Sequence, residues 1–512
     1  MPHESSIEIG ALSNRSKLIA LVAGPLAALI LYFLLPETYI NTSGQEAVFS
    51  HAGRACASIV LWMAIWWFSE AVPIAVTALL PIVLFPLLGV ASLGATLKDY
   101  SNSTIYLFLG GFLIAAGIAR WGLDRRMALL TINIVGTKPK QIVLGVLLIT
   151  AFLSAWVSNT ATAAMMLPIA MALMNLVRDT RKGQEIDRGE HNFGVALLLS
   201  IAYGASLGGM LTLIGTPPNG IFVRFVEQTY GTSVNFADWL WVSVPVIGIM
   251  LALVYFMLVN WLFREQINEL PGGRDWVRKE LASLGKLSRG EKIVLVVFVT
   301  AALLWVFGPA IRGLEIAGTK PFKPLNDAVI AMAAGIILFI IPVDYKRGIH
   351  ALDWSSASTA ISWDVLLLFG GGLTMASAIQ ATGAAEVVGA SAMALSDLPE
   401  WAILGGVSSI AIYASEFTSN TALAATLMPL VAAIAKSLSM NPEALLLCTT
   451  LGASCAFMTP VGTPPNAIVF GTGRIKIGEL IRAGFWLNLI AVVVITGICL
   501  IIPTGLIANI PT

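Results

Sequence analysis

Charged residues are scarce in this chain. Only 12% of its 512 residues are Asp, Glu, Lys or Arg, while 57% are hydrophobic, whereas a soluble globular protein usually carries about a quarter charged residues. This shortage of charge excludes a water-soluble fold. The apolar residues form long runs instead, such as 18–35, 55–90 and 239–263, which reach or approach the roughly 20 residues that cross a bilayer as a helix. We therefore predict an all-α polytopic membrane protein.

Cysteine and histidine are also rare, which excludes several kinds of chemistry. The four cysteines lie inside apolar stretches without the spacing of a metal site and are predicted to be buried free thiols: Cys56, Cys448, Cys455 and Cys499. The four histidines fall in the N-terminal tail or in connections: His3, His51, His191 and His350. An intramembrane hydrolase needs an activated nucleophile or a metal cluster, and neither can be named. We expect no enzyme and no catalytic residue, and no basic patch suggests a nucleic-acid partner.

The sequence contains an internal repeat. Ser-Asn-Thr-Ala at 158–161 recurs at 419–422, a shift of 261 residues, and Gly-Thr-Pro-Pro-Asn at 215–219 recurs at 462–466, a shift of 247. A polar insertion at about 178–192 in the first half explains the difference between the two shifts. We interpret the chain as a duplication with one loop insertion.

Loop charges indicate how the two halves cross the membrane. Basic residues flank both ends of the apolar run 142–177, so both ends should lie on the cytoplasmic side and the run should form a hairpin that enters and returns. The equivalent run 401–435 has mainly acidic flanks and is predicted to enter from outside. Counting spans gives about 11 transmembrane helices plus two re-entrant helical hairpins in an inverted-topology repeat. The N-terminus is expected in the cytoplasm and the C-terminus outside.

Four interruptions of helix at membrane depth form the candidate site. The two Ser-Asn-Thr tips are two of them, and the Pro-Pro pairs at 217–218 and 464–465 should unwind helices at Gly215 and Gly462. Such backbone persists in a membrane only where protein or a water-filled cavity satisfies it. Free carbonyls suit Na⁺, whereas free amides and helix N-termini suit an anion. The alternative, that the small polar residues only hold helices together, fits two copies beside two breaks less well.

Other features at membrane depth are interpreted as structural or left open. Glu416 lies three residues before Ser419, and both a brace for the hairpin and a direct transport role remain open for it. Glu70 is assigned to the scaffold. The glycine pairs at 110–111 and 370–371 should permit close helix packing. The polar segment 264–292 is expected to be an amphipathic connector on the membrane surface, with a regulatory role as the alternative.

At these motifs the chain resembles the divalent anion/sodium symporter family, and within it the Na⁺-dependent dicarboxylate transporter type. The resemblance runs from Glu-Ala-Val-Pro at 70–73 through both Ser-Asn-Thr tips to Thr-Pro-Pro-Asn-Ala at 463–467. It implies a homodimer that moves its substrate by an elevator-type mechanism. It also implies scaffold helices at 1–135 and 236–360, a transport domain at 136–235 and 361–480 that holds both hairpins and both broken helices, and a C-terminal helix at 481–512.

The resemblance also implies a set of site residues. The first Na⁺ site would use Ser154, Ser158, Asn159 and the Gly215 carbonyl, and the second would use Ser415, Thr418, Asn420 and the Gly462 carbonyl. The family often has Thr where this chain has Ser415, but a hydroxyl is kept. Substrate contacts would fall on Asn159, Thr160, Asn420, Thr421, Thr216, Thr463 and Pro464.

The expected function is Na⁺-coupled symport of a C4-dicarboxylate such as succinate, malate or fumarate, in the cell membrane, with Na⁺ as the coupling ion and membrane lipid as the surroundings. Sulfate or citrate as the substrate and Na⁺-independent dicarboxylate exchange are alternatives within the same fold. An anion channel is an alternative from another class, and it would conduct without saturation.

Overall fold

Helices make up nearly all of the regular structure. The computed structural model describes residues 14–40, 45–136, 138–180, 187–264, 267, 272–316 and 318–501. In this part of the chain nine helices are long and apolar enough to cross a membrane, and four shorter apolar helices accompany them. The only sheets described are two small antiparallel hairpins, β1 (Thr38–Ile40) with β2 (Glu46–Val48) and β3 (Pro342–Asp344) with β4 (Ile349–His350). The predicted all-α membrane fold is confirmed.

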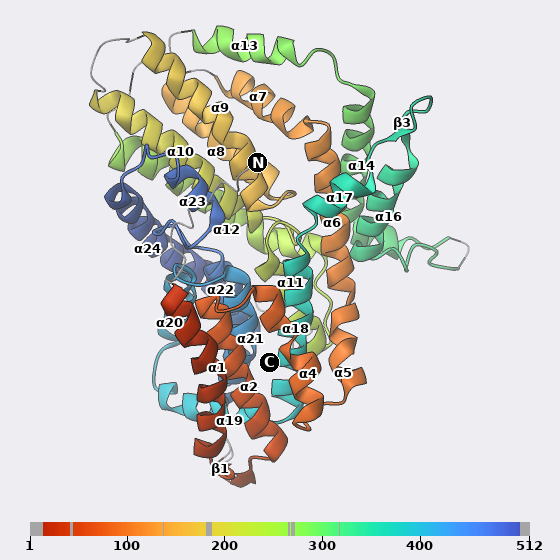
Figure 1. Cartoon of the computed structure of the whole chain (residues 1–512), viewed down its shortest axis with the longest axis vertical. Coiled ribbons are helices and arrows are strands. Elements are labelled where there is room, and N and C mark those ends of the chain that lie inside the picture. Colours follow the sequence, from red (N-terminus) through yellow and green to blue (C-terminus); the bar gives the residue numbers. More distant parts are fainter. Residues whose placement is uncertain are drawn as a thin grey trace.

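The helices follow one another with short connections (Figure 1). The first part of the chain contains α1 (Asn14–Leu34), α2 (His51–Ser69), α3 (Ile74–Ala78), α4 (Leu80–Leu87), α5 (Leu93–Lys98), η1 (Asp99–Ser101), α6 (Ser103–Arg120), α7 (Leu123–Val135), α8 (Pro139–Ser154), α9 (Asn159–Thr180), α10 (Arg188–Gly209), α11 (Pro217–Tyr230) and α12 (Phe236–Phe256). The second part contains η2 (Met257–Leu262), α13 (Gly273–Ser283), α14 (Arg289–Val306), α15 (Gly308–Gly313), α16 (Asp327–Ile340), α17 (Trp354–Ala360), α18 (Trp363–Ala381), α19 (Ala384–Ala392), η3 (Met393–Leu395), α20 (Glu400–Ser415), α21 (Asn420–Ser437), α22 (Pro442–Ala453), α23 (Pro464–Phe470) and α24 (Ile477–Ile501).

The helices are interrupted where the sequence predicts. The two Ser-Asn-Thr tips separate α8 from α9 and α20 from α21, so each forms the turn of a helical hairpin. The two Pro-Pro pairs lie at the start of α11 and α23, and the unwound backbone precedes them at 210–216 and 454–463. Proline is favoured in the first helical turn because an N–H there has no acceptor within the helix, so its absence costs no hydrogen bond. The prolines therefore begin the second half of each broken helix.

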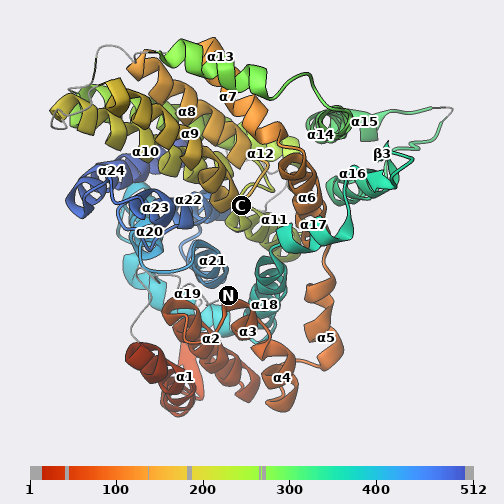
Figure 2. The same cartoon turned by 45° about the horizontal axis from the view of Figure 1, so that its top comes forward.

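Equivalent helices of the two halves make equivalent contacts. Helix α8 packs on α10 as α20 packs on α22, and α9 packs on α10 as α21 packs on α22. The halves also cross over: α9 of the first half packs on α23 of the second, while α21 of the second packs on α11 of the first. Figures 1 and 2 both show α23 beside α9 and α10. One interlocked core therefore carries all four helix interruptions.

Glycines allow close helix contacts in both halves, as predicted. A Cβ on Gly110 would lie 2.4 Å from the backbone carbon of Ala331 on α16, and a Cβ on Gly371 would lie 2.3 Å from the carbonyl oxygen of Ala78 on α3. Both approaches are shorter than any real Cβ contact. One glycine of each predicted pair therefore lets α6 or α18 meet its neighbour backbone to backbone.

The polar connector between α12 and α14 contains a helix that lies across one end of the molecule. Helix α13 packs against α7 and runs crosswise to α14 (Figure 1). The guanidinium of Arg126 on α7 donates to Glu291 at 2.6 Å and to the carbonyls of Leu284 and Gly285 at 3.0 Å. This buried ion pair fixes the end of the connector. Residues 265, 266 and 268–271 of the predicted segment lie outside the described residues.

Glu70 is the C-cap of α2. It is exposed and adopts a left-handed backbone conformation with φ of 47°. Its side chain lies at a helix end, outside the four helix interruptions.

Candidate functional site

The first hairpin tip is locked by a hydrogen bond between two predicted site residues. Ser154 ends α8 and is fully buried, and its Oγ lies 2.7 Å from both Asn159 Oδ1 and the Ala205 carbonyl oxygen, so its one hydroxyl hydrogen is shared between these two acceptors. A Cβ on Gly209 would lie only 2.4 Å from Asn159 Oδ1. The Asn159 side chain therefore lies against the end of α10, where the first helix break begins. Ser158 has a local role, since its hydroxyl accepts from the Ala161 amide at 3.3 Å.

The asparagine that closes each Gly-Thr-Pro-Pro-Asn motif holds the unwound backbone together. Asn219 donates its side-chain amide to the carbonyls of Gly209 at 3.2 Å and Thr212 at 2.7 Å. Asn466 makes the same pair of contacts one repeat later, with the carbonyls of Ala456 at 3.1 Å and Thr459 at 2.9 Å. Both side chains are fully buried, and both side-chain oxygens are without a hydrogen-bond partner.

These two asparagines were missing from the predicted site set. Their signal was present in the sequence, because Asn ends both copies of the motif at the same shift of 247 residues. Each break is also tied to the adjoining tip by a threonine: Thr212 donates to the Ala155 carbonyl, and Thr459 donates to the Glu416 carbonyl at 2.7 Å. The tip and the break of each half therefore form one unit.

Glu416 braces the second break. Its carboxylate is 1% exposed and accepts from the backbone amides of Phe457 at 2.7 Å, Met458 at 2.9 Å and Thr459 at 2.9 Å. Asn488 on α24 donates to the same carboxylate at 2.7 Å. These contacts give Glu416 the structural role that the sequence left open. Ala155 holds the equivalent position in the first half, so the first break lacks this negative charge.

The second tip differs from the first in its hydrogen bonding. Ser415 donates to the Ile412 carbonyl of its own helix at 2.7 Å, and Thr418 donates to the Ala414 carbonyl at 3.0 Å. Asn420 Oδ1 is buried without a hydrogen-bond partner. A buried polar atom left unpaired costs about 1–3 kcal/mol, so this oxygen is available to a ligand. Thr463 Oγ1 at the second break is buried and unpaired as well.

The remaining predicted site residues differ in their exposure to solvent. Thr216, Thr463, Thr421 and Gly462 are buried, whereas Thr160 and Pro464 are exposed. Hydrogen bonds among the described residues join each tip to the break of its own half, and none joins Asn159 to Asn420. The structure therefore brings together the site residues of each half separately.

The chemistry of the site is that of oxygen ligands and amide donors. Within the described part of the chain, no group of three or more His, Cys, Asp or Glu residues could hold a metal ion. The four cysteines are free and buried, as predicted. Hydroxyl, side-chain amide and backbone carbonyl oxygens remain as ligands, and they suit a hard monovalent or divalent cation.

A helical membrane protein with two hairpin tips and two broken helices in one core has the architecture of a secondary transporter. Residues 16–506 match the family model described as the sodium:sulfate symporter transmembrane region. The chain belongs to this family, which confirms the resemblance read from the motifs and shows that the protein is a transporter and not an enzyme.

Curated relatives agree with this assignment, and two solved structures share the fold. The sodium-dependent dicarboxylate transporter SdcS of Staphylococcus saprophyticus is 37% identical over 483 residues, covering 94% of this chain and 90% of that protein. SdcS of Staphylococcus aureus is 36% identical over 484 residues with the same coverage. Among solved structures, the Alcanivorax borkumensis YdaH transporter matches with a TM-score of 0.60 at 14% identity, covering 96% of this chain and 99% of that one. Neisseria gonorrhoeae MtrF matches with a TM-score of 0.58 at 12% identity over 96% and 94%. These two share the fold alone.

Proposed function

We propose that this protein couples the movement of Na⁺ to the uptake of a C4-dicarboxylate such as succinate, malate or fumarate. The observation that carries this proposal is the likeness, along 94% of the chain, to proteins named sodium-dependent dicarboxylate transporters. The family match covers residues 16–506, a range that contains both tips and both breaks.

Two Na⁺ sites are proposed, one in each half. The first uses Ser154, Ser158, Asn159 and the Gly215 carbonyl, and it is supported by the 2.7 Å approach of Ser154 Oγ to Asn159 Oδ1. A Cβ on Gly215 would lie 2.4 Å from the Gly209 carbonyl oxygen, so the backbone is crowded at this point.

The second proposed Na⁺ site uses Ser415, Thr418, Asn420 and the Gly462 carbonyl. The buried, unpaired Asn420 Oδ1 supports it, because a cation would supply the missing partner. Each site consists of oxygen ligands, which fits Na⁺. Bound Na⁺ would add positive charge near the tips, and the oxygen ligands of each site would determine its position.

The substrate is proposed to lie at helix N-termini. Asn159 begins α9, Asn420 begins α21 and Thr216 precedes α11. The N-terminus of a helix carries partial positive charge and free amides, which favour a carboxylate. We propose that Asn159, Asn420, Thr160 and Thr421 contact the substrate, with Thr216, Thr463 and Pro464 around them.

A second candidate substrate is sulfate, because the matching family model is described by sodium:sulfate symport. Citrate and Na⁺-independent exchange are weaker candidates. The same amide donors fit any small oxyanion, so competition for transport must separate them. The unpaired oxygen of Asn420 favours a cation-dependent cycle over exchange without Na⁺.

The proposed function also includes an elevator-type movement of the transport domain and assembly into a homodimer. Residues 136–235 and 361–480 would move together against scaffold helices at 1–135 and 236–360 in an elevator-type cycle, with 481–512 as the C-terminal helix. The crossed packing of α9 on α23 and of α21 on α11 supports a single moving body that contains both halves of the site. We also propose an inverted repeat, a homodimer, a cytoplasmic N-terminus and a C-terminus outside the cell membrane.

Uptake of labelled succinate into proteoliposomes tests the function. Uptake should be saturable, should require an inward Na⁺ gradient and should be inhibited by unlabelled fumarate and malate more strongly than by sulfate or citrate. Equal uptake with and without the gradient would refute Na⁺ coupling. Stronger inhibition by sulfate would assign the substrate to the second candidate.

Variants test the site itself. Asn159→Ala and Asn420→Ala should each abolish uptake, whereas Asn260→Ala, at an exposed surface position on η2, should not. Normal transport by either tip variant would rule out the proposed site.

A further inference from the structure

A polar cavity lies outside the helix interruptions. It has a volume of about 50 Å³ and lies between the end of α9, the start of α10 and the loop before α24. Arg178, Glu190, His191 and Arg474 contribute its polar wall, and Met174 and Phe193 contribute apolar surface. Because one water needs about 10–15 Å³ of such space, the cavity holds about three to five water-sized groups. None of these residues belongs to the site described above.

The cavity lies at the ends of three candidate membrane spans. Three candidate spans end beside it: Asn159–Arg178 ends at a cavity residue, Arg188–Gly209 begins two residues before Glu190, and Ile477–Ile501 begins three residues after Arg474. Charged residues at the ends of spans lie at the level of the lipid headgroups. The cavity is therefore at the depth where phosphate and ammonium groups of phospholipids are found.

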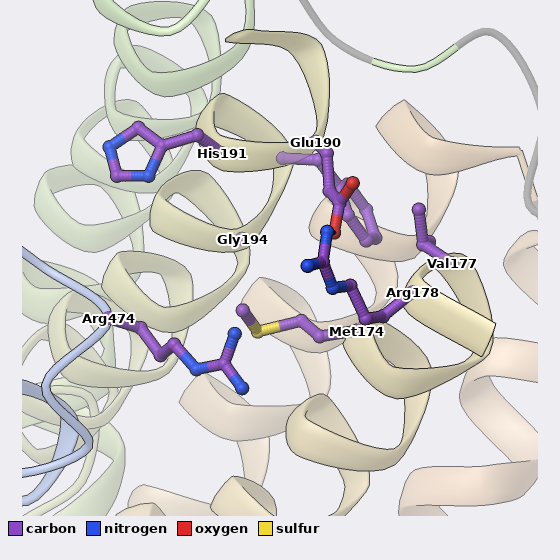
Figure 3. Close-up of a pocket in the computed structure, with 8 residues that line it drawn as sticks. Met174, Val177, Arg178, Glu190, His191, Gly194 and Arg474 are labelled. Carbon is purple, nitrogen blue, oxygen red and sulfur yellow. The ribbon is translucent and has the colours of Figure 1, made fainter. Parts of the chain in front are cut away.

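Its basic side chains come from segments far apart in the sequence. Figure 3 shows the Arg178 guanidinium beside the Glu190 carboxylate, with the Arg474 guanidinium near Met174. Arg178 Nη1 lies 3.9 Å from Glu190 Oε1. Arg474 is exposed and has no ion pair within the described part of the chain. The His191 ring is already engaged, since its Nε2 lies 2.6 Å from Glu479 Oε1 on α24.

The Glu190 carboxylate is the unusual group in this cavity. Its side chain is 10% exposed, and its Oε2 is buried without a hydrogen-bond partner. Leaving a buried charged oxygen unpaired is costly, more so than for a neutral group. A ligand that brings an N–H donor to Glu190 and an anionic group to Arg474 would remove this cost.

We propose that this cavity binds the headgroup of a phospholipid with a primary ammonium, that is, of the phosphoethanolamine type. The ammonium and its two carbons enter beside Glu190, and the phosphate stays at the rim against Arg474 and Arg178. Guanidinium groups bind phosphate oxygens through paired, charge-assisted hydrogen bonds. A phosphocholine headgroup has the same charges but no N–H, so it cannot satisfy Glu190 Oε2.

The helix that follows the cavity has an apolar exposed face that fits acyl chains. Ile477, Ile481 and Phe485 follow Arg474 on α24 at a spacing of four residues, and they are 48%, 42% and 43% exposed. Residues four apart lie on one face of a helix, so α24, which begins three residues after Arg474, presents an exposed apolar stripe to its surroundings. A free headgroup in solution has no acyl chains to pack on this stripe. The membrane lipid is therefore the proposed ligand.

Native mass spectrometry of the purified full-length protein tests the proposal. The protein is mixed with equal amounts of phosphatidylethanolamine, phosphatidylcholine and phosphatidylglycerol that carry the same acyl chains. Phosphatidylethanolamine should be retained about tenfold over phosphatidylcholine, because one charge-assisted hydrogen bond distinguishes them. Equal retention of the two, or preferential retention of phosphatidylglycerol, would overturn the proposal.

Two variants assign the contacts. Glu190→Gln should reduce retention of phosphatidylethanolamine to the level of phosphatidylcholine, and Arg474→Gln should reduce retention of all three lipids. Lys476→Gln, an exposed position on the same loop outside the cavity, is the matched control and should change nothing. Unchanged lipid retention in Arg474→Gln would refute the phosphate contact even where Glu190→Gln does not fold.

Soluble phosphoethanolamine distinguishes the lipid from a free ligand. Under the proposal it should raise the thermal midpoint of the lipid-free protein far less than phosphatidylethanolamine does at the same concentration. An equal rise with both would assign the cavity to a soluble ligand and refute its role as a lipid site.

Discussion

Replacing Glu416 with Gln is predicted to loosen the second helix break. Glu416 Oε1 accepts three hydrogen bonds, from the amides of Phe457 and Met458 and from the side chain of Asn488, and Oε2 accepts one from the amide of Thr459. A glutamine in the same rotamer keeps one oxygen and places an NH₂ group where Oε2 was. It therefore loses one bond and faces the Thr459 N–H with another donor.

The size of the effect follows from these four contacts. A hydrogen bond to a charged group contributes about 1.5–3 kcal/mol and a neutral one about 0.5–1.5 kcal/mol, so each of the three weakened bonds loses about 1–1.5 kcal/mol. The orphaned amide costs about 1–3 kcal/mol more, which gives a total loss of about 4–7 kcal/mol. Removing a buried charge also relieves several kcal/mol of desolvation. We expect a net loss of about 1–4 kcal/mol, most of it felt at the break that carries the Gly462 carbonyl.

The assay is the Na⁺ dependence of succinate uptake into proteoliposomes. Because every 1.4 kcal/mol is tenfold in affinity, the Na⁺ concentration for half-maximal uptake should rise by at least about fivefold in Glu416→Gln. Glu400→Gln neutralises an exposed carboxylate at the start of the same hairpin and should leave the Na⁺ dependence unchanged. A Na⁺ titration of Glu416→Gln that matches the unsubstituted protein would refute the role of Glu416 as the brace of this break.

Three further substitutions have defined outcomes. Gly209→Ala places a Cβ 2.4 Å from Asn159 Oδ1 and should reduce uptake about a hundredfold by displacing that side chain, whereas Gly248→Ala, with no atom within 4 Å, should transport normally. Asn466→Ala removes the donor to two carbonyls of the second break, so thermal stability and uptake should both fall, and an unchanged thermal midpoint would contradict this. Glu291→Gln breaks a buried ion pair and should destabilise the fold by about 3–5 kcal/mol without changing the Na⁺ dependence, as thermal unfolding and uptake assays together can test.

The interruptions of helix could be predicted because their causes are local. Proline and glycine act through their own backbone, so the pairs at 217–218 and 464–465 specify where α11 and α23 begin. The repeated Ser-Asn-Thr predicted the position of both tips, because each apolar run is long enough for two helices and must turn near its middle. Close packing at Gly110 and Gly371 was predictable for the same reason, because only glycine permits such an approach.

The partners of side chains could not be predicted because they depend on tertiary packing. Asn219 and Asn466 follow their proline pairs in the sequence, but the carbonyls they bind lie seven and ten residues away, across an unwound segment. The brace at Glu416 depends on amides more than forty residues later. The cavity that contains Glu190 forms where three segments far apart in the sequence meet. Periodicity and motif spacing carry no information on such contacts.

The two halves of the candidate site are not electrically equivalent. In the first half, neutral donors from α12 hold the break: Trp239 donates to the Met210 carbonyl at 3.0 Å, and Ser243 donates to the Leu211 carbonyl at 2.7 Å. In the second half a carboxylate holds it, and Glu416 Oε2 lies 3.1 Å from where a Cβ on Gly462 would be.

Two opposite unit charges about 6 Å apart attract by about 3 kcal/mol at an effective dielectric constant of about 20. A cation bound by Asn420 and Gly462 should therefore gain attraction that a cation bound by Asn159 and Gly215 lacks. The duplicated sequence thus supports two Na⁺ sites of unequal affinity, and Glu416→Gln should reduce the difference between them. A Na⁺-binding titration of the unsubstituted protein tests this. Equal affinities of the two sites would show that Glu416 acts only by holding the backbone and not through its charge.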